Sequence, residues 1–570
     1  MRLIYKYIIF YTGCCLLGLV GAANAGPEDV LGAIPSVSDA GLTQKRLSAE
    51  PTPKFGNGKS TIQGFEKPAM PSGADKIHFT FNKVIFEGNT VFSSEELETI
   101  FKSSEHKNIS LTDLQNMVDA VTAKYRNAGY ILSRAILPPQ TIKGGVVKVQ
   151  VIEGFISHII IKGDISWVKS EVNGYSEEIL KSKPLNIKVL ENSLLLSNDL
   201  PGMTVKAVLT PSPNVPAGAD LTLVATEQRY NGYLSYDNFG TRYLGPKELG
   251  AGITGNSLTF PGSSDSFRFM TVTQTDEMQY YQLLHTNPIG NSGGKFTFDA
   301  EYTDTLPGFT LSQLNVRGRS QLFYVDLSYP MVRSRQENFN IHSSFNYQNV
   351  MSTILGEPFY NDLLRSLIIG GQYTLLDQYR GFNTVQINLK HGFTIMGAVM
   401  HVNQSRPLAV PDYTHINLDL SRLQALWSNF TLFMAIQGQY AFNPLLATEQ
   451  YAYGGAYWGR GYDPSEIVGD SGLAGKLELR IDTAPARVWL QSVQYYVFYD
   501  LGEIWNRDGV DLQARQSAIS TGFGARFVFI PNLTANLFVA QPLTHSISAQ
   551  VLMNKNPRIP RGFFQLVATF

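Results

Sequence analysis

From residue 230 to its end, the chain consists of short segments in which apolar and polar residues alternate. Alternation with a period of two predicts strands whose two faces meet different surroundings. One face of the last segment carries mostly apolar side chains, at Phe564, Leu566, Ala568 and Phe570. An aromatic strand of this kind suits the lipid side of an outer-membrane barrel, although a strand of a soluble sandwich has the same pattern.

A second pair of segments near the C-terminus distinguishes between these two environments. In Phe523–Phe529 the aromatic residues share one face, and Arg526 lies on the other. A charge opposite a continuous apolar face indicates a wet lumen behind a lipid-facing wall. This segment is expected to form a hairpin with Leu533–Val539. Because a membrane strand with its connection takes about 20 residues, residues 229–570 predict a transmembrane β-barrel of about 16 antiparallel strands.

The stretch before the barrel has a different sequence pattern, which predicts small α+β modules. In the first, a strand at Val84–Asn89 precedes a short helix at Ser94–Phe101, whose acidic first turn suits the helix dipole. Thr112–Gln115 has the pattern of a capping box that opens a second helix. The apolar face of that helix consists of Leu114, Met117, Val118, Val121 and Tyr125. Strands at Ile131–Leu137 and Val146–Ile152 complete the order strand, helix, helix, strand, strand.

A weaker copy of this pattern follows. Ile159–Asp164 repeats the strand at Val84–Asn89, and Gly163 stands 75 residues after Gly88. The other elements predicted for this copy are helices near Glu177–Lys181 and Ile187–Asn198 and strands at Thr204–Thr210 and Ala219–Thr226. Two modules of about 75 residues each are the simplest interpretation of this internal repeat.

Residues 1–25 have the three parts of a secretory signal peptide. Two basic residues and an apolar stretch precede Ala23–Ala25, which provides a cleavage site. A membrane-anchoring helix is the alternative, but the apolar stretch is short for a full span. Residues 26–76 are rich in Pro, Gly and Ser and predict a linker. Within it, Ser38–Leu47 fits either a short helix or a disordered segment.

Composition supports an exported barrel and argues against several other functions. Charged residues make up 16% of the chain, whereas about 25% is usual in soluble proteins. The 33 Phe, 28 Tyr and 50 Gly match the aromatic girdles and bends of a membrane barrel. The net charge of −1 argues against a nucleic-acid partner. Both cysteines, Cys14 and Cys15, lie in the signal, so the mature chain offers no thiolate for catalysis or metal binding.

One segment matches a catalytic motif by its letters. Gly290–Gly294 reads G-x-S-x-G, but a hydrolase elbow joins a strand to a helix, and here Lys295–Phe298 continues as a strand. A hairpin turn is therefore expected. The nine histidines have no metal-ligand spacing, and no nucleotide-binding loop is present. The sequence predicts no catalytic residue, no metal and no cofactor.

Five motifs together resemble those of two-partner secretion transporters of the TpsB type. Leu137–Gln140 and Gly145–Gly154 are similar to the end of that family's first POTRA module, and Asp237–Gly240 to its first barrel hairpin. Gly459–Tyr462 resembles the V/I-R-G-Y/F motif of the long sixth loop. Phe498–Gly502 resembles the F-x-D-x-G motif of an inner-wall strand. The family is the haemolysin- and adhesin-exporting branch of the POTRA-bearing outer-membrane barrels.

The resemblance implies a division of the chain and a set of functional residues. The parts are a signal (1–25), a linker with a possible plug helix (26–76), POTRA 1 (77–153), POTRA 2 (154–228) and a barrel (229–570). The residues implied for transport are Gly459, Arg460, Gly461, Tyr462, Phe498, Asp500 and Gly502, with Phe570 as the barrel assembly signal. Arg460 would pair with Asp500 inside the lumen. Gly459 stands where the family usually has Val or Ile, which would loosen the loop tip.

The implied function is export of a dedicated, secreted TpsA-type exoprotein across the bacterial outer membrane. The POTRA modules would receive it in the periplasm, and folding outside would supply the energy. Further implied partners are outer-membrane lipid and the barrel assembly machinery. The alternatives are an assembly factor of the same superfamily, a porin and, as an enzymatic outlier, a barrel-fused esterase. A haemolysin, an adhesin, a contact-inhibition toxin and a haem-scavenging protein all fit as the exported partner.

Overall fold

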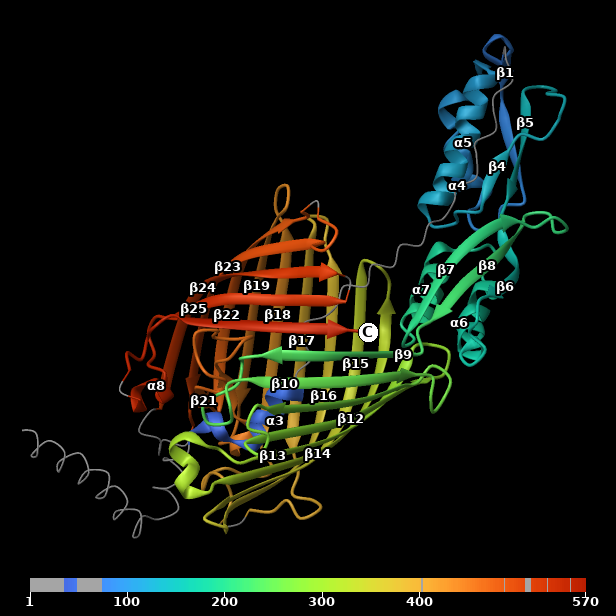
Figure 1. Cartoon of the computed structure of the whole chain (residues 1–570). Helices are drawn as coiled ribbons and strands as arrows, with labels where there is room; N and C mark the ends of the chain where they lie inside the picture. The colour runs from blue at the N-terminus through green and yellow to red at the C-terminus, as the bar shows by residue number, and fades with distance from the viewer. Residues whose placement is uncertain are drawn as a thin grey trace, which may run out of the picture.

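The computed structural model contains two small α+β modules, a large β-barrel and a helix inside that barrel (Figure 1). The structure describes residues 35–48, 74–400, 403–485, 487–507, 514–530, 532–553 and 555–570. The predicted signal peptide lies outside the described residues, as does most of the predicted linker. Within the described ranges, no helix combines the length and the apolar character needed to cross a membrane.

The first module packs two helices against two small sheets. Its elements are η2 (Ala74–Lys76), β1 (His78–Phe81), β2 (Lys83–Glu87), α4 (Ser94–Glu98), η3 (Lys102–Ser104), β3 (Lys107–Ser110), α5 (Leu111–Asn127), β4 (Arg134–Ile136) and β5 (Val146–Ile152). Strands β1 and β3 form one sheet, and the other has the order β2-β5-β4. The predicted face of α5 is buried, with Leu114, Val118, Val121 and Tyr125 almost inaccessible.

The cap of α5 differs from the prediction at Thr112–Gln115. The capping box is formed by Ser110, whose Oγ accepts from Asp113 N at 3.1 Å, and by Asp113, whose carboxylate accepts from Ser110 N at 3.0 Å. Strand β3 ends at Ser110, which is still extended, so the chain turns into the helix there and the first free helical N–H groups follow directly.

A partly exposed hydrogen-bond network closes the first module at Glu153. Its Oε1 accepts from Thr90 N at 2.7 Å, Val91 N at 3.0 Å and the Tyr125 hydroxyl at 2.8 Å. Burial alone would raise the pKa of Glu153, but these hydrogen bonds outweigh it and hold the pKa below its ordinary value. The carboxylate therefore stabilises the module above its ordinary pKa, and this contribution disappears as the pH falls through the lowered value.

We expect Glu153→Gln to lower the unfolding free energy of this module at neutral pH by about 1 kcal/mol, since the carboxylate is partly exposed. The variant should also lose less stability in acid than the unsubstituted protein. Hydrogen exchange of the α5 amides in the full-length protein at several pH values measures both effects. Equal acid sensitivity of the two proteins would contradict this role of Glu153.

The second module repeats the architecture with one sheet. Its elements are β6 (Phe155–Lys162), α6 (Lys169–Lys181), α7 (Ile187–Asn198), β7 (Met203–Pro211) and β8 (Gly218–Glu227), and the sheet has the order β6-β8-β7. The predicted helix at Ile187–Asn198 is found with those bounds, and α6 begins eight residues before the predicted Glu177 because Val172 and Tyr175 also pack into the core.

Sixteen antiparallel strands close into a barrel, as the alternation predicted. They are β9 (Tyr230–Asp237), β10 (Glu248–Asn256), β11 (Ser264–Val272), β12 (Met278–Ile289), β13 (Gly294–Thr305), β14 (Arg317–Arg333), β15 (Glu337–Ile354), β16 (Glu357–Leu376), β17 (Gly381–Gly392), β18 (Thr414–Ala425), β19 (Phe430–Ala441), β22 (Ser471–Thr483), β23 (Ser492–Trp505), β24 (Arg515–Ile530), β25 (Leu533–Pro542) and β26 (Arg561–Thr569). Strand β26 pairs with β9 and closes the barrel.

The two wall faces follow the predicted pattern. Phe523 is 63% exposed on the outer face, whereas Arg526 points inward and binds Glu478 at 2.8 Å. Phe523 pairs with Val539, so the expected hairpin is present. Gly290–Gly294 turns from β12 into β13, as expected of a hairpin turn and unlike a hydrolase elbow.

The second module is attached to one rim of the barrel by charged and apolar contacts. Arg333, at the end of β14, donates from Nε and Nη2 to the two Asp199 carboxylate oxygens, both at 2.7 Å. On the neighbouring β12–β13 turn, a Cβ on Gly293 would lie 2.5 Å from Leu196 Cδ2, so the turn lies directly against α7. The module is therefore held at the rim near β12–β15.

Candidate transport lumen

The long connection between β19 and β22 folds back into the barrel, and Arg460 binds the wall from it. Its Nη2 lies 2.7 Å from Asp500 Oδ1, its Nε 2.9 Å from Asp500 Oδ2, and its Nη1 2.7 Å from Glu478 Oε2. Arg460 is 4% exposed and Asp500 is fully buried. The pair that the sequence resemblance implied is thus present, in the forked geometry that guanidinium and carboxylate favour.

Two further residues of the wall, Phe498 and Glu478, contact Arg460. The Arg460 guanidinium lies 3.5 Å from the centroid of the Phe498 ring, a cation–π contact. Glu478 accepts from Arg460 and also pairs with Arg480 at 2.7 Å and Arg526 at 2.8 Å. Glu478 was not predicted as a functional residue. The signal was present in the sequence, because Lys476, Glu478 and Arg480 alternate with Leu477 and Leu479 on one strand.

The glycines of the loop tip are required by close packing. Gly459 has φ of 76°, and a Cβ there would lie 2.6 Å from the Tyr453 ring. The expectation that Gly459 loosens the tip is therefore not what the structure shows, because the glycine is what lets the tip pack on Tyr453. A Cβ on Gly502 would also strike Tyr453, at 2.3 Å. Gly461 packs on Ser520, and the Tyr462 hydroxyl donates to Ile519 O at 2.7 Å.

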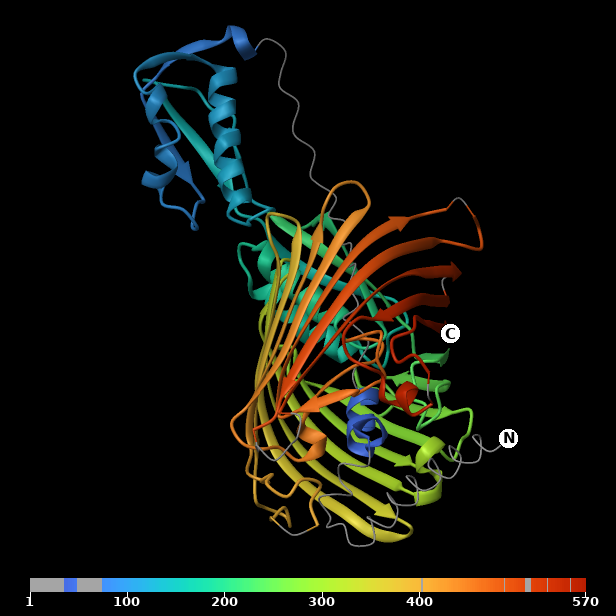
Figure 2. The same cartoon turned by 90° about the vertical axis from the view of Figure 1, so that its left-hand side faces the viewer.

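A short helix, α3 (Ala40–Ser48), lies inside the barrel, preceded by η1 (Ser36–Ser38) (Figure 2). Polar side chains along the helix, and Asp39 directly before it, bind the wall. The distances are 2.5 Å from Tyr360 Oη to Asp39, 2.5 Å from Ser320 Oγ to Gln44 Oε1, 2.6 Å from Arg46 to Glu248 and 2.6 Å from Ser48 Oγ to Glu301. These bonds reach strands β10, β13, β14 and β16, so the helix is held from several sides of the lumen.

The helix also rests on the long loop, at η5 (Ala447–Glu449). Lys45 Nζ donates to Gln450 O at 3.1 Å, and a Cβ on Gly41 would lie 2.2 Å from Thr448 Oγ1. Glu449 holds η5 on the wall through Lys390 at 2.7 Å. Its other oxygen accepts from His415, a buried residue of β18, at 3.1 Å. Loop, helix and wall therefore meet at η5.

We expect Gly41→Ala to displace α3, because the added methyl group overlaps Thr448. An overlap of this kind costs about 1–3 kcal/mol. The fraction of barrels in which α3 has left its position in the lumen should therefore rise roughly tenfold. The double variant Gly41→Ala/Thr448→Ala removes the two nearest Thr448 atoms and should return α3 to its position in the lumen. Planar-bilayer conductance of the two variants and of Thr448→Ala alone makes the comparison. An open double variant would contradict the assigned contact.

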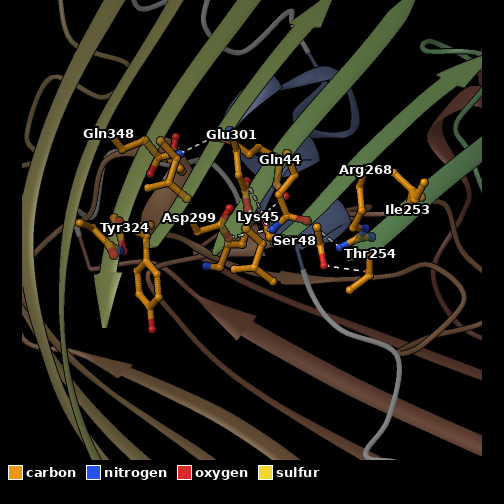
Figure 3. Close-up of a pocket in the computed structure, with 18 of the residues that line it drawn as sticks. Gln44, Lys45, Ser48, Ile253, Thr254, Arg268, Asp299, Glu301, Tyr324 and Gln348 are labelled. Carbon is orange, nitrogen blue, oxygen red and sulfur yellow. Dashed lines mark hydrogen bonds between the residues drawn. The ribbon is translucent and has the colours of Figure 1, made fainter. Parts of the chain in front are cut away.

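A cavity of about 570 Å³ separates part of α3 from the wall (Figure 3). Gln44, Lys45 and Ser48 line it from the helix, facing Arg268 and Glu301 among others. A second cavity of about 560 Å³ shares Tyr324 with the first and reaches Asp199 and Arg333 at the rim. The two cavities therefore lie next to each other along the inner wall, on either side of Tyr324.

The comparisons with known proteins match this arrangement. Residues 79–154 match the domain described as "POTRA domain, ShlB-type". Residues 220–527 match the family described as "Haemolysin secretion/activation protein ShlB/FhaC/HecB". The heme/hemopexin transporter protein HuxB of Haemophilus influenzae strain 86-028NP is 25% identical over 89% of this chain and 90% of its own length. The outer membrane transporter CdiB of Dickeya dadantii is 22% identical over 76% of this chain and 78% of its own.

Solved structures share the fold. CdiB from Escherichia coli superimposes with a TM-score of 0.71 over 88% of this chain and 93% of its own, at 18% identity. CdiB from Acinetobacter baumannii gives a TM-score of 0.62 over 94% and 99%, at 17% identity.

Proposed function

The chain belongs to the family of haemolysin secretion/activation proteins of the ShlB/FhaC/HecB type, which are outer-membrane transporters, and we propose that α3 and the Arg460 loop gate its export lumen. The barrel lies in the outer membrane, and the POTRA modules lie on its periplasmic side. The protein therefore exports an exoprotein by two-partner secretion. The observation that carries the gating proposal is that α3 and the loop fill one lumen and touch at η5.

Reception of the cargo is assigned to the exposed edges of the POTRA sheets. An extended chain can add a strand to such an edge, which satisfies its backbone groups without reading much sequence. The edge strands of the two larger sheets are β2, β4, β6 and β7. The cavity that runs from Asp199 to Tyr324 then offers a way into the lumen. Folding of the exported chain outside supplies the driving force in this scheme.

The cargo is proposed to be a haem-related exoprotein. The relatives named heme/hemopexin transporter align over about nine-tenths of both chains, whereas the CdiB transporter of Dickeya dadantii aligns over about three-quarters. The assembly-factor alternative receives less support, because the described residues form two POTRA modules and the family match is to secretion proteins. Outer-membrane lipid and the barrel assembly machinery remain the further proposed partners, with Phe570 as the assembly signal.

Deletion of the coding region tests the export function. The culture medium and the outer-membrane fraction are compared with and without the protein. We expect one large exported protein to disappear from the medium while other barrels stay at their normal levels. Restoring the full chain should restore that protein. A broad loss of outer-membrane barrels would instead assign the assembly function.

A further inference from the structure

An Asp–His pair in hydrogen-bond contact faces outward from the barrel wall, on the side that contacts lipid. Asp265 of β11 and His285 of β12 are cross-strand neighbours, and His285 Nδ1 lies 2.8 Å from Asp265 Oδ1. By alternation both share a face with Phe267 and Leu283, which are 41% and 58% exposed. Ionisable side chains on the lipid side of a barrel are costly near the membrane centre and cheap near its interfaces. The pair therefore needs a polar environment or a polar partner.

The wall beside this pair is hollowed by a groove of about 380 Å³. Its apolar lining consists of Tyr230, Ile253, Leu258, Phe267, Leu283 and Phe298. Asp265 and His285 line the same groove, so polar atoms meet an otherwise apolar surface at one place. A molecule that fits this surface has a hydrocarbon chain and a polar group attached to it.

The position of the pair along the strands indicates which leaflet supplies that molecule. Asp265 is the second residue of β11, so only Ser264 separates it from the turn of residues 257–263 on the POTRA side. Thr259 of this turn donates to Asp265 Oδ2 at 3.0 Å, and the Phe260 ring lies edge-on to His285 at 6.1 Å. With a rise of about 3.3 Å per residue, Asp265 lies within a few ångströms of the end of β11 at the rim, which places the pair near the headgroups.

The same turn touches the second POTRA module. A Cβ on Gly262 would lie 3.0 Å from Leu200 Cδ2, so the turn packs on the end of that module. One face of the turn therefore lines the groove through Leu258, and the other supports POTRA 2. A molecule that occupies the groove therefore also orders the contact between this turn and POTRA 2.

We propose that this groove binds one amine-bearing glycerophospholipid of the periplasmic leaflet. An acyl chain lies along Ile253, Phe267 and Leu283, which continue the lipid-facing surface of the barrel. The ammonium group donates to Asp265, and the phosphate lies beside His285, whose Nδ1 faces Asp265. The bound lipid stabilises the turn at residues 257–263 and, through it, the docked position of POTRA 2.

Lipid retention by the full-length protein tests this site. The protein is purified in mild detergent, incubated with phosphatidylethanolamine or phosphatidylglycerol, and analysed by native mass spectrometry. We expect one retained phosphatidylethanolamine per chain and weaker retention of phosphatidylglycerol. Asp265→Asn should reduce retention of phosphatidylethanolamine about tenfold, as expected for loss of one charge-assisted hydrogen bond. Ile253→Trp, which fills the groove without replacing Asp265 or His285, should reduce retention of both lipids.

The matched control is Asp304→Asn, because Asp304 is also an aspartate of the outer wall that pairs with a basic residue, Arg317 at 2.6 Å. Asp304 lies at the end of β13 that is away from the POTRA side, so Asp304→Asn should not change lipid retention. Equal retention in Asp265→Asn and Asp304→Asn would mean annular lipid only and would overturn the proposal. Secretion is measured in parallel. Normal export by Asp265→Asn after loss of the lipid would overturn only the link between the lipid and POTRA 2 docking, whereas absent export by the unsubstituted protein would overturn the proposed function.

Discussion

Arg460→Ala is expected to leave the barrel inserted and to reduce export at least about tenfold. Removal of the guanidinium leaves Asp500, which is fully buried, without its forked partner. An uncompensated buried charge of this kind costs about 3–5 kcal/mol, so the loop tip should leave its position on β23. Heat-modifiable migration reports the folded barrel, and the exported protein in the medium reports transport.

Two further variants decide whether the geometry or only the charge matters. Arg460→Lys keeps the charge but cannot form the fork with Asp500, so export should fall to an intermediate level. Arg317→Ala is the matched control, because Arg317 also makes a two-bond contact with an aspartate, Asp304, but is 48% exposed. Exposed pairs contribute little, so this variant should export normally. Normal export by Arg460→Ala would contradict the role assigned to the loop tip.

Deletion of residues 40–48 is expected to open the lumen. Three wall contacts, made by Gln44, Arg46 and Ser48, and the contact with Thr448 hold α3 in place, and all of them disappear with the helix. Channel conductance should rise several-fold, and cells should become sensitive to antibiotics too large for ordinary porins. Export itself should continue, because the Arg460 contacts are made by the loop and the wall.

Arg46→Ala provides a graded comparison for the deletion. Arg46 binds Glu248 with two hydrogen bonds, at 2.6 and 3.1 Å, in a partly buried position. Loss of these bonds costs about 1.5–3 kcal/mol, which is part of what the whole helix contributes. Conductance should therefore lie between that of the unsubstituted protein and that of the deletion. A deletion variant with unchanged conductance would contradict the assignment of α3 as a plug.

The barrel was predictable because each strand carries its own evidence. Arg526 opposite Phe523 indicates two environments within one segment, and the same pattern recurs along the chain. The Arg460–Asp500 pair was accessible only through the resemblance of two motifs, since nothing local links residues 40 positions apart. The strand pattern of β22 placed Glu478 on the inner face, but its three arginine partners come from the loop, from β22 itself and from β24.

The contacts of α3 could not be predicted, because they join residues that are remote in sequence. Arg46 and Glu248 are 202 positions apart, and Lys45 and Gln450 are 405 apart. The helix sequence is weakly amphipathic, so its own pattern does not tell a lumen from a solvent-exposed linker. Only the closed barrel brings these groups together. The cap of α5 was misplaced for a smaller reason of the same kind, since strand β3 sets where the helix begins.

The most direct test of the central claim is a cross-link between the cargo and the wall position that α3 covers at rest. Gln348 donates to Gln44 Oε1 at 2.9 Å and points into the lumen, whereas Phe523 faces lipid. A photoreactive residue is placed at each of these two positions in otherwise unchanged protein. During export, position 348 should cross-link to the exoprotein, and without cargo to α3, while position 523 should link to neither. Normal export with no cross-link to the exoprotein at position 348 would contradict passage through this lumen.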